Sequence, residues 1–258
     1  NTTSKMKRRR TFILCISLLL AGSAGFAQAP KSDSVPVFKD RYGLRLGVDA
    51  LKLARTFYEE DYRGLELTGD YRLSKKYYAA AEVGNESKTT VEDNINFTTK
   101  GSYLKIGFDY NAHTNWLDLE NMIYIGLRYG FSTFQQELNS YRVYNPNPYW
   151  GEDDVSISGA EYKGLTAHWA EAVVGIKAQV FRDVFVGFSF RMNRLLSSKE
   201  PDGFENLHIP GYNRVYSAEF GVGMNYTVSY FIPLYKKDKV KAGKSDGKKP
   251  KRETDANP

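Results

Sequence analysis

The sequence predicts an all-β protein, an eight-stranded antiparallel transmembrane β-barrel with a polar, charged interior. Segments in which apolar and polar residues alternate recur eight times along the chain. Alternation with a period of two is typical of a strand that has one apolar and one polar face. The connections between these segments also alternate between short and long. An even number of strands joined in this way is the pattern of a barrel that spans a membrane.

The first 27 residues have the pattern of a secretory signal peptide. Residues 7–10 are Lys-Arg-Arg-Arg, residues 11–21 form a short apolar core, and small residues precede Gln28. The apolar core is too short for a spanning helix, so we expect cleavage before Gln28 and export. Cys15 is the only cysteine and lies in this core. The exported chain is therefore expected to hold no disulfide and no cysteine-based metal site.

The net charge of +6 does not indicate a nucleic-acid-binding protein. Residues 1–27 contain five basic residues and no acidic one, and residues 236–258 contain nine basic and four acidic residues. The chain between these two ends is net negative. A basic surface that follows a phosphate backbone is therefore not expected, and no nucleic-acid partner is predicted.

We expect the barrel over residues 41–235, after a short polar lead at residues 28–40. The predicted strands cover residues 42–48, 65–73, 77–83, 104–110, 123–131, 168–176, 184–192 and 214–233. Tight turns are expected at residues 74–76 and 181–183. Longer connections are expected around residues 85–98, 138–160 and 197–211.

The last segment, Arg214–Pro233, has the longest alternation of the chain. Every second residue from Tyr216 to Tyr230 is apolar or aromatic, and the residues between them are small or polar, with Glu219 among them. We expect this strand to pair with residues 41–50 and close the barrel, because an unpaired strand edge is not tolerated in lipid. Tyr226 and Tyr230 are then predicted to lie in an aromatic girdle at the periplasmic interface.

A soluble lipocalin-type barrel has the same alternation with its faces reversed. Three features favour the membrane barrel. The apolar set carries no charge in the middle of the strands, and a Lys or Arg there costs about 2–4 kcal/mol when it faces lipid. Glycines concentrate in the polar set, where they leave room in a narrow lumen for long side chains. Aromatic residues gather towards the strand ends, as interfacial girdles do.

The polar set predicts a lumen in which charges of both signs pair, since buried charges need partners. The cations are six and the carboxylates seven: Arg45, Arg72, Lys105, Arg128, Lys177 and Arg191, with Asp49, Glu66, Asp70, Glu82, Asp109, Glu171 and Glu219. A selective ion pathway is one interpretation. A lumen that is simply filled by ion pairs is the interpretation we favour for eight strands.

The three histidines do not predict a catalytic or metal site, because they are expected at different levels of the barrel. His113 is placed in a periplasmic turn and His168 on the lipid-facing set near a rim. His208 is placed in an external loop, where a solvated side chain is expected. A lipid-modifying site at the rim, with His208 beside Glu205 and Ser197, remains an alternative. We expect no enzymatic activity and no cofactor.

Two segments outside the strands are candidate contact surfaces. The long loop contains Tyr149, Trp150, Glu152, Asp153 and Asp154, which favour either a partner-binding surface or an ordinary solvated loop. Calcium binding by its three acids is a third interpretation, although the spacing is not that of a calcium loop. The tail at residues 236–258 is predicted to be disordered. On the periplasmic side it could touch lipid headgroups, peptidoglycan or an acidic protein.

Eight strands, an expected signal peptide and an intra-barrel charge network make residues 41–235 resemble the small OmpA/OmpX-type barrels. The Phe26-Ala27-Gln28 junction and the Tyr-rich strands also look like uncharacterised barrel families of Bacteroidota. Two departures are the lack of a following peptidoglycan-binding domain and of a terminal aromatic residue. The resemblance implies an integral protein of the outer membrane, in contact with its lipids and with both termini periplasmic.

We predict the first of three functions for this location and keep the other two as alternatives. The first is a non-enzymatic structural, scaffolding or partner-binding role, as an accessory subunit of an envelope complex. The second is a narrow pore for ions or small solutes. The third is a lipid-modifying enzyme at the rim. The strand pattern favours none of the three by itself.

Overall fold

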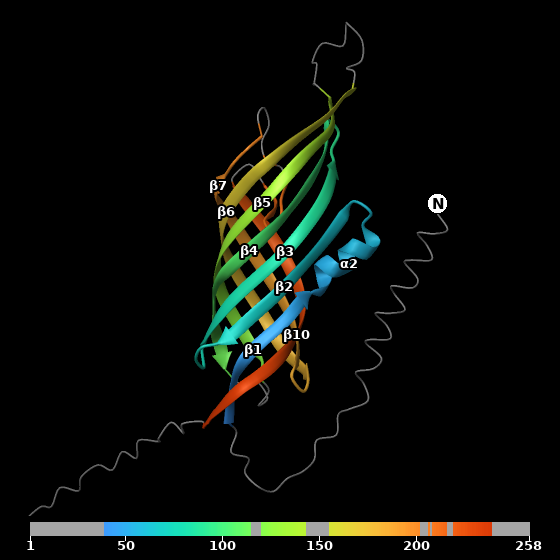
Figure 1. The fold of residues 1–258 in the computed structure, drawn as a ribbon. Coiled ribbons are helices and arrows are strands. Elements are labelled where there is room, and N and C mark those ends of the chain that lie inside the picture. The colour runs from blue at the N-terminus through green and yellow to red at the C-terminus, as the bar shows by residue number, and fades with distance from the viewer. Residues whose placement is uncertain are drawn as a thin grey trace, which may run out of the picture.

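The computed structural model describes residues 39–114, 120–142, 155–201, 206, 208–215 and 219–238. Eight long strands form one closed antiparallel barrel in the order β1-β10-β7-β6-β5-β4-β3-β2 (Figure 1). The barrel strands are β1 (Lys39–Asp49), β2 (Tyr62–Arg72), β3 (Tyr77–Val91), β4 (Ile95–Thr114), β5 (Met122–Arg142), β6 (Val155–Phe181), β7 (Val184–Ser198) and β10 (Phe220–Asp238). The fold class predicted from the alternation is confirmed.

The barrel closes between the first and the last strand. β1 pairs with β10 from Lys39 opposite Asp238 to Asp49 opposite Thr227. The start of β1 and the end of β10 therefore lie at one rim, which we call the termini-side rim, and the opposite rim is the distal rim. The predicted lead and tail were too long by a few residues, because residues 39–40 and 236–238 belong to this pair of strands. The predicted signal peptide and tail residues 239–258 lie outside the described residues.

Strand β10 differs from its predicted bounds at both ends. It begins at Phe220 rather than at Arg214, because Arg214 belongs to a separate short strand and Glu219 has a φ of 58°. It also continues past Pro233. The pairing shifts by one residue there, between Tyr42 and Gly43 on the partner strand. A bulge of this kind is a position where a strand tolerates proline, which has no N–H to donate.

Strands β4, β5 and β6 are much longer than predicted, with 20, 21 and 27 residues. Most of the segment expected as a polar loop at residues 85–98 is strand, and so are both ends of the loop expected at residues 138–160. A strand needs only about 9–11 residues to cross a membrane. The three strands therefore continue well beyond the membrane towards the distal rim.

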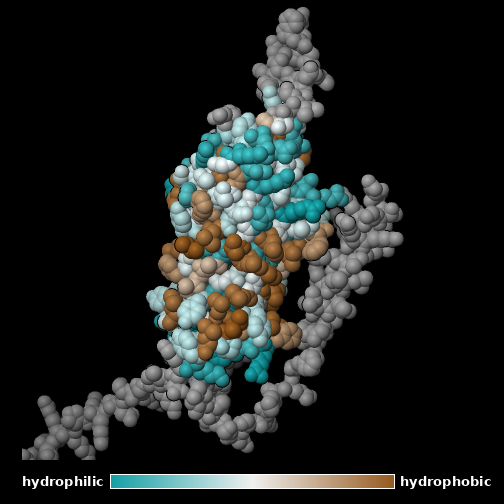
Figure 2. All heavy atoms as spheres, viewed as in Figure 1, coloured by the Kyte–Doolittle hydropathy of each residue, from teal (hydrophilic) through white to brown (hydrophobic). Residues whose placement is uncertain are grey.

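A row of polar side chains across four strands marks the level where the exterior changes. Asn85 pairs with Ser102, Ser102 with Thr133, and Thr133 with Thr166. On the termini side of this row, the outward residues of β5 are Ile123, Ile125, Leu127, Tyr129 and Phe131. On the distal side they are polar. Figure 2 shows the hydrophobic band and the hydrophilic surface beyond it. We call these two parts the membrane half and the distal half.

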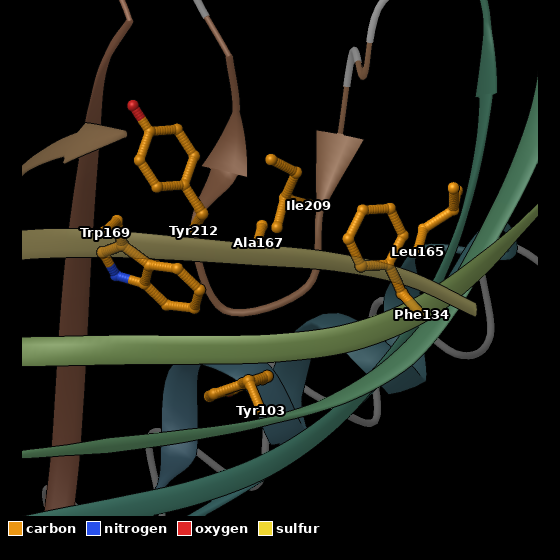
Figure 3. Packing of buried hydrophobic residues seen from close by; sticks show 7 residues of the cluster. All are labelled: Tyr103, Phe134, Leu165, Ala167, Trp169, Ile209 and Tyr212. Atoms are coloured by element: carbon orange, nitrogen blue, oxygen red, sulfur yellow. The ribbon is translucent and has the colours of Figure 1, made fainter. Parts of the chain in front are cut away.

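The interior of the barrel is closed by a small apolar core that spans the polar row. Its buried members are Tyr103, Phe134, Leu165, Ala167, Trp169, Ile209 and Tyr212 (Figure 3). Ile209 and Tyr212 come from a hairpin formed by β8 (His208–Ile209) and β9 (Asn213–Arg214). Tyr212 packs against Trp169 in a T-shaped contact, with the two ring planes at 81°. The hairpin therefore folds back into the barrel mouth, and the prediction of a solvated excursion over residues 197–211 is wrong for residues 208–211.

A helix that was not predicted from the sequence, α2 (Ala50–Tyr58), follows β1 directly. The side chain of Asp49 caps it by accepting hydrogen bonds from the backbone N–H of Leu51 and Lys52. The helix takes the place that a longer β1 would occupy between β2 and β10. Thr56 Oγ1 donates to Gly64 O at 3.1 Å and accepts from Gly64 N at 2.9 Å, so it covers part of the free edge of β2. Over the described ranges, no helix is both long and apolar enough to cross a membrane.

Candidate functional site

The lumen of the membrane half is filled by a continuous network of ion pairs. Its cations are Arg45, Lys52, Lys105, Arg128, Lys177 and Arg191, and its carboxylates are Glu66, Asp70, Glu82, Glu86, Asp109 and Glu171. Asp49 is buried beside them, where it caps α2 and accepts a hydrogen bond from Asn225. Almost all of these side chains are buried. In this set β2 and β3 supply only carboxylates, β1, β5 and β7 supply only cations, and β4 and β6 supply both signs. We call this set the charge ladder.

The ladder begins near the termini-side rim with aspartates. Lys177 Nζ lies 2.7 Å from Asp70 Oδ2 and 3.8 Å from Asp109 Oδ2. Arg45 approaches the other oxygen of Asp70 at 3.6 Å. Arg128 lies 2.7 Å from Asp109. Each aspartate is therefore shared between two cations, which offsets the cost of removing its charge from water.

The middle of the ladder is centred on Arg191. Its guanidinium donates to both oxygens of Glu82, at 2.6 and 3.0 Å, and to Glu171 at 2.6 Å. A bidentate pairing of this kind fixes the geometry as well as the charge. Lys105 Nζ lies 3.4 Å from Glu171, 3.5 Å from Glu82 and 3.8 Å from Glu66. Lys105 thus links the middle of the ladder to its distal end.

The distal end of the ladder is built around Lys52 of α2. Lys52 Nζ lies 2.9 Å from Glu66 and 2.9 Å from Glu86. Tyr103 donates to Glu66 at 2.6 Å, and Tyr62 donates to Glu86 at 2.7 Å. These bonds tie α2 to β2, β3 and β4. The helix therefore contributes the last cation of the ladder as well as part of the wall.

The structure brings most of the predicted lumen residues together, with two exceptions. Arg72 lies near the termini-side rim, where it donates to Arg41 O at 2.8 Å. Glu219 is exposed and precedes β10, so its assignment to the lumen is wrong. The reason is the positive φ at Glu219, which interrupts the alternation before the strand begins.

Two members of the ladder were missed. Glu86 lies on the same face of β3 as Glu82, and extending the alternation beyond residue 83 would have found it. Lys52 had no such signal in the sequence. It follows the predicted first strand and reaches the lumen only because α2 turns back against β2.

The glycines of the inward set make room mainly for aromatic rings. A side chain at Gly130 would collide with the indole of Trp169, and one at Gly84 would collide with the ring of Tyr103. These glycines were predicted to leave room for long charged side chains. That holds at Gly126, which faces Asp109 and Arg128.

The three histidines lie apart. His113 is exposed near the end of β4, and His168 is on the exterior of β6, where its Nδ1 is 2.7 Å from the hydroxyl of Tyr129. His208 is buried at 4% exposure, so the prediction of a solvated side chain is wrong. The described ranges contain no cluster of three or more His, Cys, Asp or Glu residues that could hold a metal.

His208 has no hydrogen-bond partner for either ring nitrogen among the described residues. Burial, reinforced by Lys88, Arg55 and Lys52, lowers the pKa of His208 to about 4, against the attraction of Glu86. The imidazole is therefore neutral at pH 7. Ser197 lies on β7 opposite His168, and Glu205 is outside the described residues. A site formed by His208 with these two residues consequently rests on no described contact.

A cavity of about 410 Å³ opens beside His208. It lies where α2, β10 and the β8–β9 hairpin meet, and its wall includes Lys52, Lys88 and Asn193. The residues of the candidate loop, Tyr149, Trp150, Glu152, Asp153 and Asp154, lie outside the described residues.

A closed antiparallel barrel of eight strands, apolar outside and charged inside, has the architecture of an outer-membrane protein. The chain folds as a closed eight-stranded β-barrel whose exposed apolar exterior fits a membrane. It belongs to the family DUF6048, described as a domain of unknown function, whose model matches residues 7–237.

Among solved structures, the chain is similar to Ail, the attachment invasion locus protein of Yersinia pestis, with 8% identity and a TM-score of 0.37. That match covers 75% of this chain and 99% of the other. Neisserial surface protein A is similar with 10% identity and a TM-score of 0.39, covering 76% of this chain and 99% of the other. A search of curated proteins found no match.

Proposed function

We propose that the protein is a non-enzymatic outer-membrane scaffold that binds a partner through its distal half. The observation that carries this proposal is the unequal use of strand length. β4, β5 and β6 have about twice the residues needed to cross a membrane, and they remain paired beyond the polar row. Ordering these extra residues costs conformational entropy and does nothing for anchoring. A surface held rigidly away from the membrane is the use we assign to them.

The exterior of this surface is polar. On β5, the outward side chains beyond the polar row include Gln135, Glu137 and Asn139. The candidate loop with Tyr149 and Trp150 connects the distal ends of β5 and β6. In this proposal, a rigid polar sheet that carries an aromatic and acidic loop is the contact surface for another envelope protein. The tail, with its basic residues, is a second contact for headgroups, peptidoglycan or an acidic protein.

Position-specific photocrosslinking in cells tests the partner role. A photoreactive amino acid is placed at Glu137 or Tyr149 on the distal side, and at Leu127 in the apolar band as the matched control. The expected result is a discrete protein adduct of constant mass from the distal positions and none from Leu127. Only unmodified protein at every distal position would overturn the proposal.

The lumen supports a scaffold better than a pore. The charge ladder occupies it from Asp70 to Glu86, and the β8–β9 hairpin covers its distal end. We expect no conductance from the purified protein in planar bilayers at several voltages. Steady, voltage-independent conductance would establish the narrow pore instead. Changed lipid A or phospholipid profiles on deletion would establish the lipid-modifying alternative.

The proposed orientation places both termini in the periplasm and the distal half outside the cell. The termini-side rim carries the turn at Ser74, and the distal half carries Glu137. Labelling of intact cells with a membrane-impermeant maleimide separates the two sides, because the only native cysteine is Cys15. Glu137→Cys is expected to react and Ser74→Cys is not. The opposite pattern would reverse the orientation.

A further inference from the structure

The barrel wall has a lateral cleft at the level where β1 ends. Above Asp49, β10 has no strand partner on the β1 side, and α2 lies there instead. The cavity of about 410 Å³ occupies the space between α2 and residues 222–225 of β10. The β8–β9 hairpin and β3 form its distal wall. The cleft therefore runs from the exterior of β10 towards the distal end of the charge ladder.

The polar wall of the cleft is basic. It contains Lys52, Arg55, Lys88, Lys105, Arg191 and Arg214, and no acidic residue is part of the lining. Most of these cations have carboxylate partners behind the wall. Lys88 is the exception: among the described residues, no carboxylate lies within ion-pair distance of its ammonium group. Burial, followed by the nearby charge of Arg55, lowers the pKa of Lys88, against the attraction of Glu59 and Glu86.

One buried side chain on the wall presents unused hydrogen-bonding atoms. His208 is 4% exposed, and neither of its ring nitrogens has a partner among the described residues. Buried polar groups without partners cost free energy unless a ligand satisfies them. A neutral imidazole and a lysine that face one basic cavity fit an anion with several oxygen atoms.

The outer wall of the same cleft is apolar and belongs to the membrane half. Val222 and Met224 of β10 and Phe190 of β7 line it, with exposed fractions of 51%, 57% and 45%. A small soluble anion would gain no favourable contact from this apolar wall. An amphiphile would gain one, because its acyl chains could lie on the hydrophobic band of the exterior while its headgroup entered the cleft.

We propose that this cleft binds the phosphate of an anionic membrane lipid, with the acyl chains lying on the apolar exterior beside β10. Lys88 supplies the unpaired charge, and His208 donates one N–H to a phosphate oxygen. α2 closes the cleft on one side, and its Leu53 and Phe57 point outward, with 37% and 65% exposed. This site is separate from the distal sheet, so its failure would leave the proposed partner role untouched.

Native mass spectrometry of the full exported chain tests the proposal. The protein is taken from nanodiscs that contain phosphatidylcholine with or without phosphatidylglycerol. We expect one phosphatidylglycerol molecule to be retained in preference to phosphatidylcholine, and Lys88→Gln to weaken that retention about tenfold. Lys100→Gln is the matched control, because Lys100 pairs opposite Ser87 at the same level and is exposed on the exterior. It is expected to bind like the parent chain.

A second measurement does not depend on folding of the Lys88 variant. The imidazole ¹⁵N resonances of His208 in the parent chain, assigned with His208→Gln, are expected to shift when phosphatidylglycerol is added. Equal retention of both lipids, an equal loss in Lys100→Gln, or unmoved His208 resonances would overturn the proposal. A shift with inorganic phosphate alone, without lipid retention, would also overturn it, because the apolar wall would then have no role.

Discussion

The membrane half and the distal half are built from the same strands but have opposite chemistry. In the membrane half of β5, Leu127 faces outward and Arg128 faces the lumen. In the distal half of the same strand, Glu137 faces outward while Phe134 and Leu138 are buried. The pleat continues without interruption, so the two faces stay the same while their polarity exchanges. One barrel therefore has an ion-paired core inside lipid and an apolar core inside water.

The difference shows that the medium, and not the strand geometry, decides which face is apolar. In lipid, burying apolar side chains inside would gain little, because the exterior is equally apolar. The interior can then hold charges, provided that they pair. In water the hydrophobic effect operates again, and the interior takes Phe134 and Leu165. The polar row at Asn85, Ser102, Thr133 and Thr166 marks the boundary between the part of the barrel in lipid and the part in water.

The largest expected effect comes from breaking the charge ladder. Arg191→Met leaves Glu82 and Glu171 buried without their main partner, and is expected to lower the free energy of unfolding by about 3–5 kcal/mol. Denaturant unfolding from lipid vesicles measures it. Adding Glu82→Gln and Glu171→Gln to Arg191→Met should restore part of the loss. If the triple variant is no more stable than the single one, unpaired charge is not the cause.

A charge on the exterior separates the two halves directly. Leu127→Arg places a cation on the apolar band and is expected to cost about 2–4 kcal/mol of unfolding free energy. Thr133 lies further along β5 on the same outward face. Thr133→Arg is expected to cost at most about 1 kcal/mol of unfolding free energy, because Thr133 lies at the polar row. Equal costs in the same unfolding assay would contradict the placement of the boundary.

Acid is expected to loosen the distal core and leave the membrane half in place. The hairpin opens to release His208, whose pKa then returns from about 4 towards the ordinary 6.5. The pKa of His208 is lower in the closed hairpin than in the open one. Closure of the hairpin therefore keeps its full favourable free energy above pH 6.5. It weakens as pH falls to about 4, by roughly 3 kcal/mol at most. The charges that face this histidine are Glu86 and Lys88 of β3, with Arg55 and Lys52 of α2.

Fluorescence of Trp169 measures this opening, because its indole packs on Tyr212 of the hairpin. Trp116→Phe and Trp150→Phe make Trp169 the only reporter. The emission should shift to the red between pH 6.5 and 4, and His208→Gln should flatten the profile. The same shift in His208→Gln would assign the transition to another group, and His168→Gln controls for the exterior histidine.

The smallest change in unfolding free energy is expected at the contact between α2 and the edge of β2. Thr56→Val keeps the shape of the side chain and removes both hydrogen bonds to Gly64. The expected loss is about 1 kcal/mol in unfolding free energy. Faster hydrogen exchange at the Gly64 amide should accompany it. An unchanged exchange rate at Gly64 would show that α2 does not protect the edge of β2.

Sequence patterns predicted the membrane half well and the distal half poorly, for one physical reason. Alternation was followed only while the apolar set stayed on one parity. Beyond Val83 on β3 both faces are polar, and beyond Phe131 on β5 the apolar residues Phe134 and Leu138 lie on the inward face, so neither continuation shows the earlier alternation. Glu86 was within reach of the same pattern, two residues past the last residue assigned to that strand.

Features made by contacts between distant segments could not be predicted. The burial of His208 depends on Ile209 and Tyr212 finding the core around Trp169. The position of Lys52 depends on α2 lying against β2. Neither contact leaves a periodic signal in the chain. The basic cleft is a product of both, which is why a histidine expected in a solvated loop became part of a candidate binding site.

The pairing of β1 with β10 also constrains the order in which the barrel strands assemble. Asn225 of β10 donates to Glu66 of β2 across a separation of 159 residues, and Lys39 pairs with Asp238. Contacts between such distant residues form slowly. Until β10 arrives, both edges of the growing sheet, on β1 and on β7, have no partner, and lipid does not tolerate such edges. Completion of this barrel therefore awaits its final strand, and its assembly intermediates need an outside partner for those two edges.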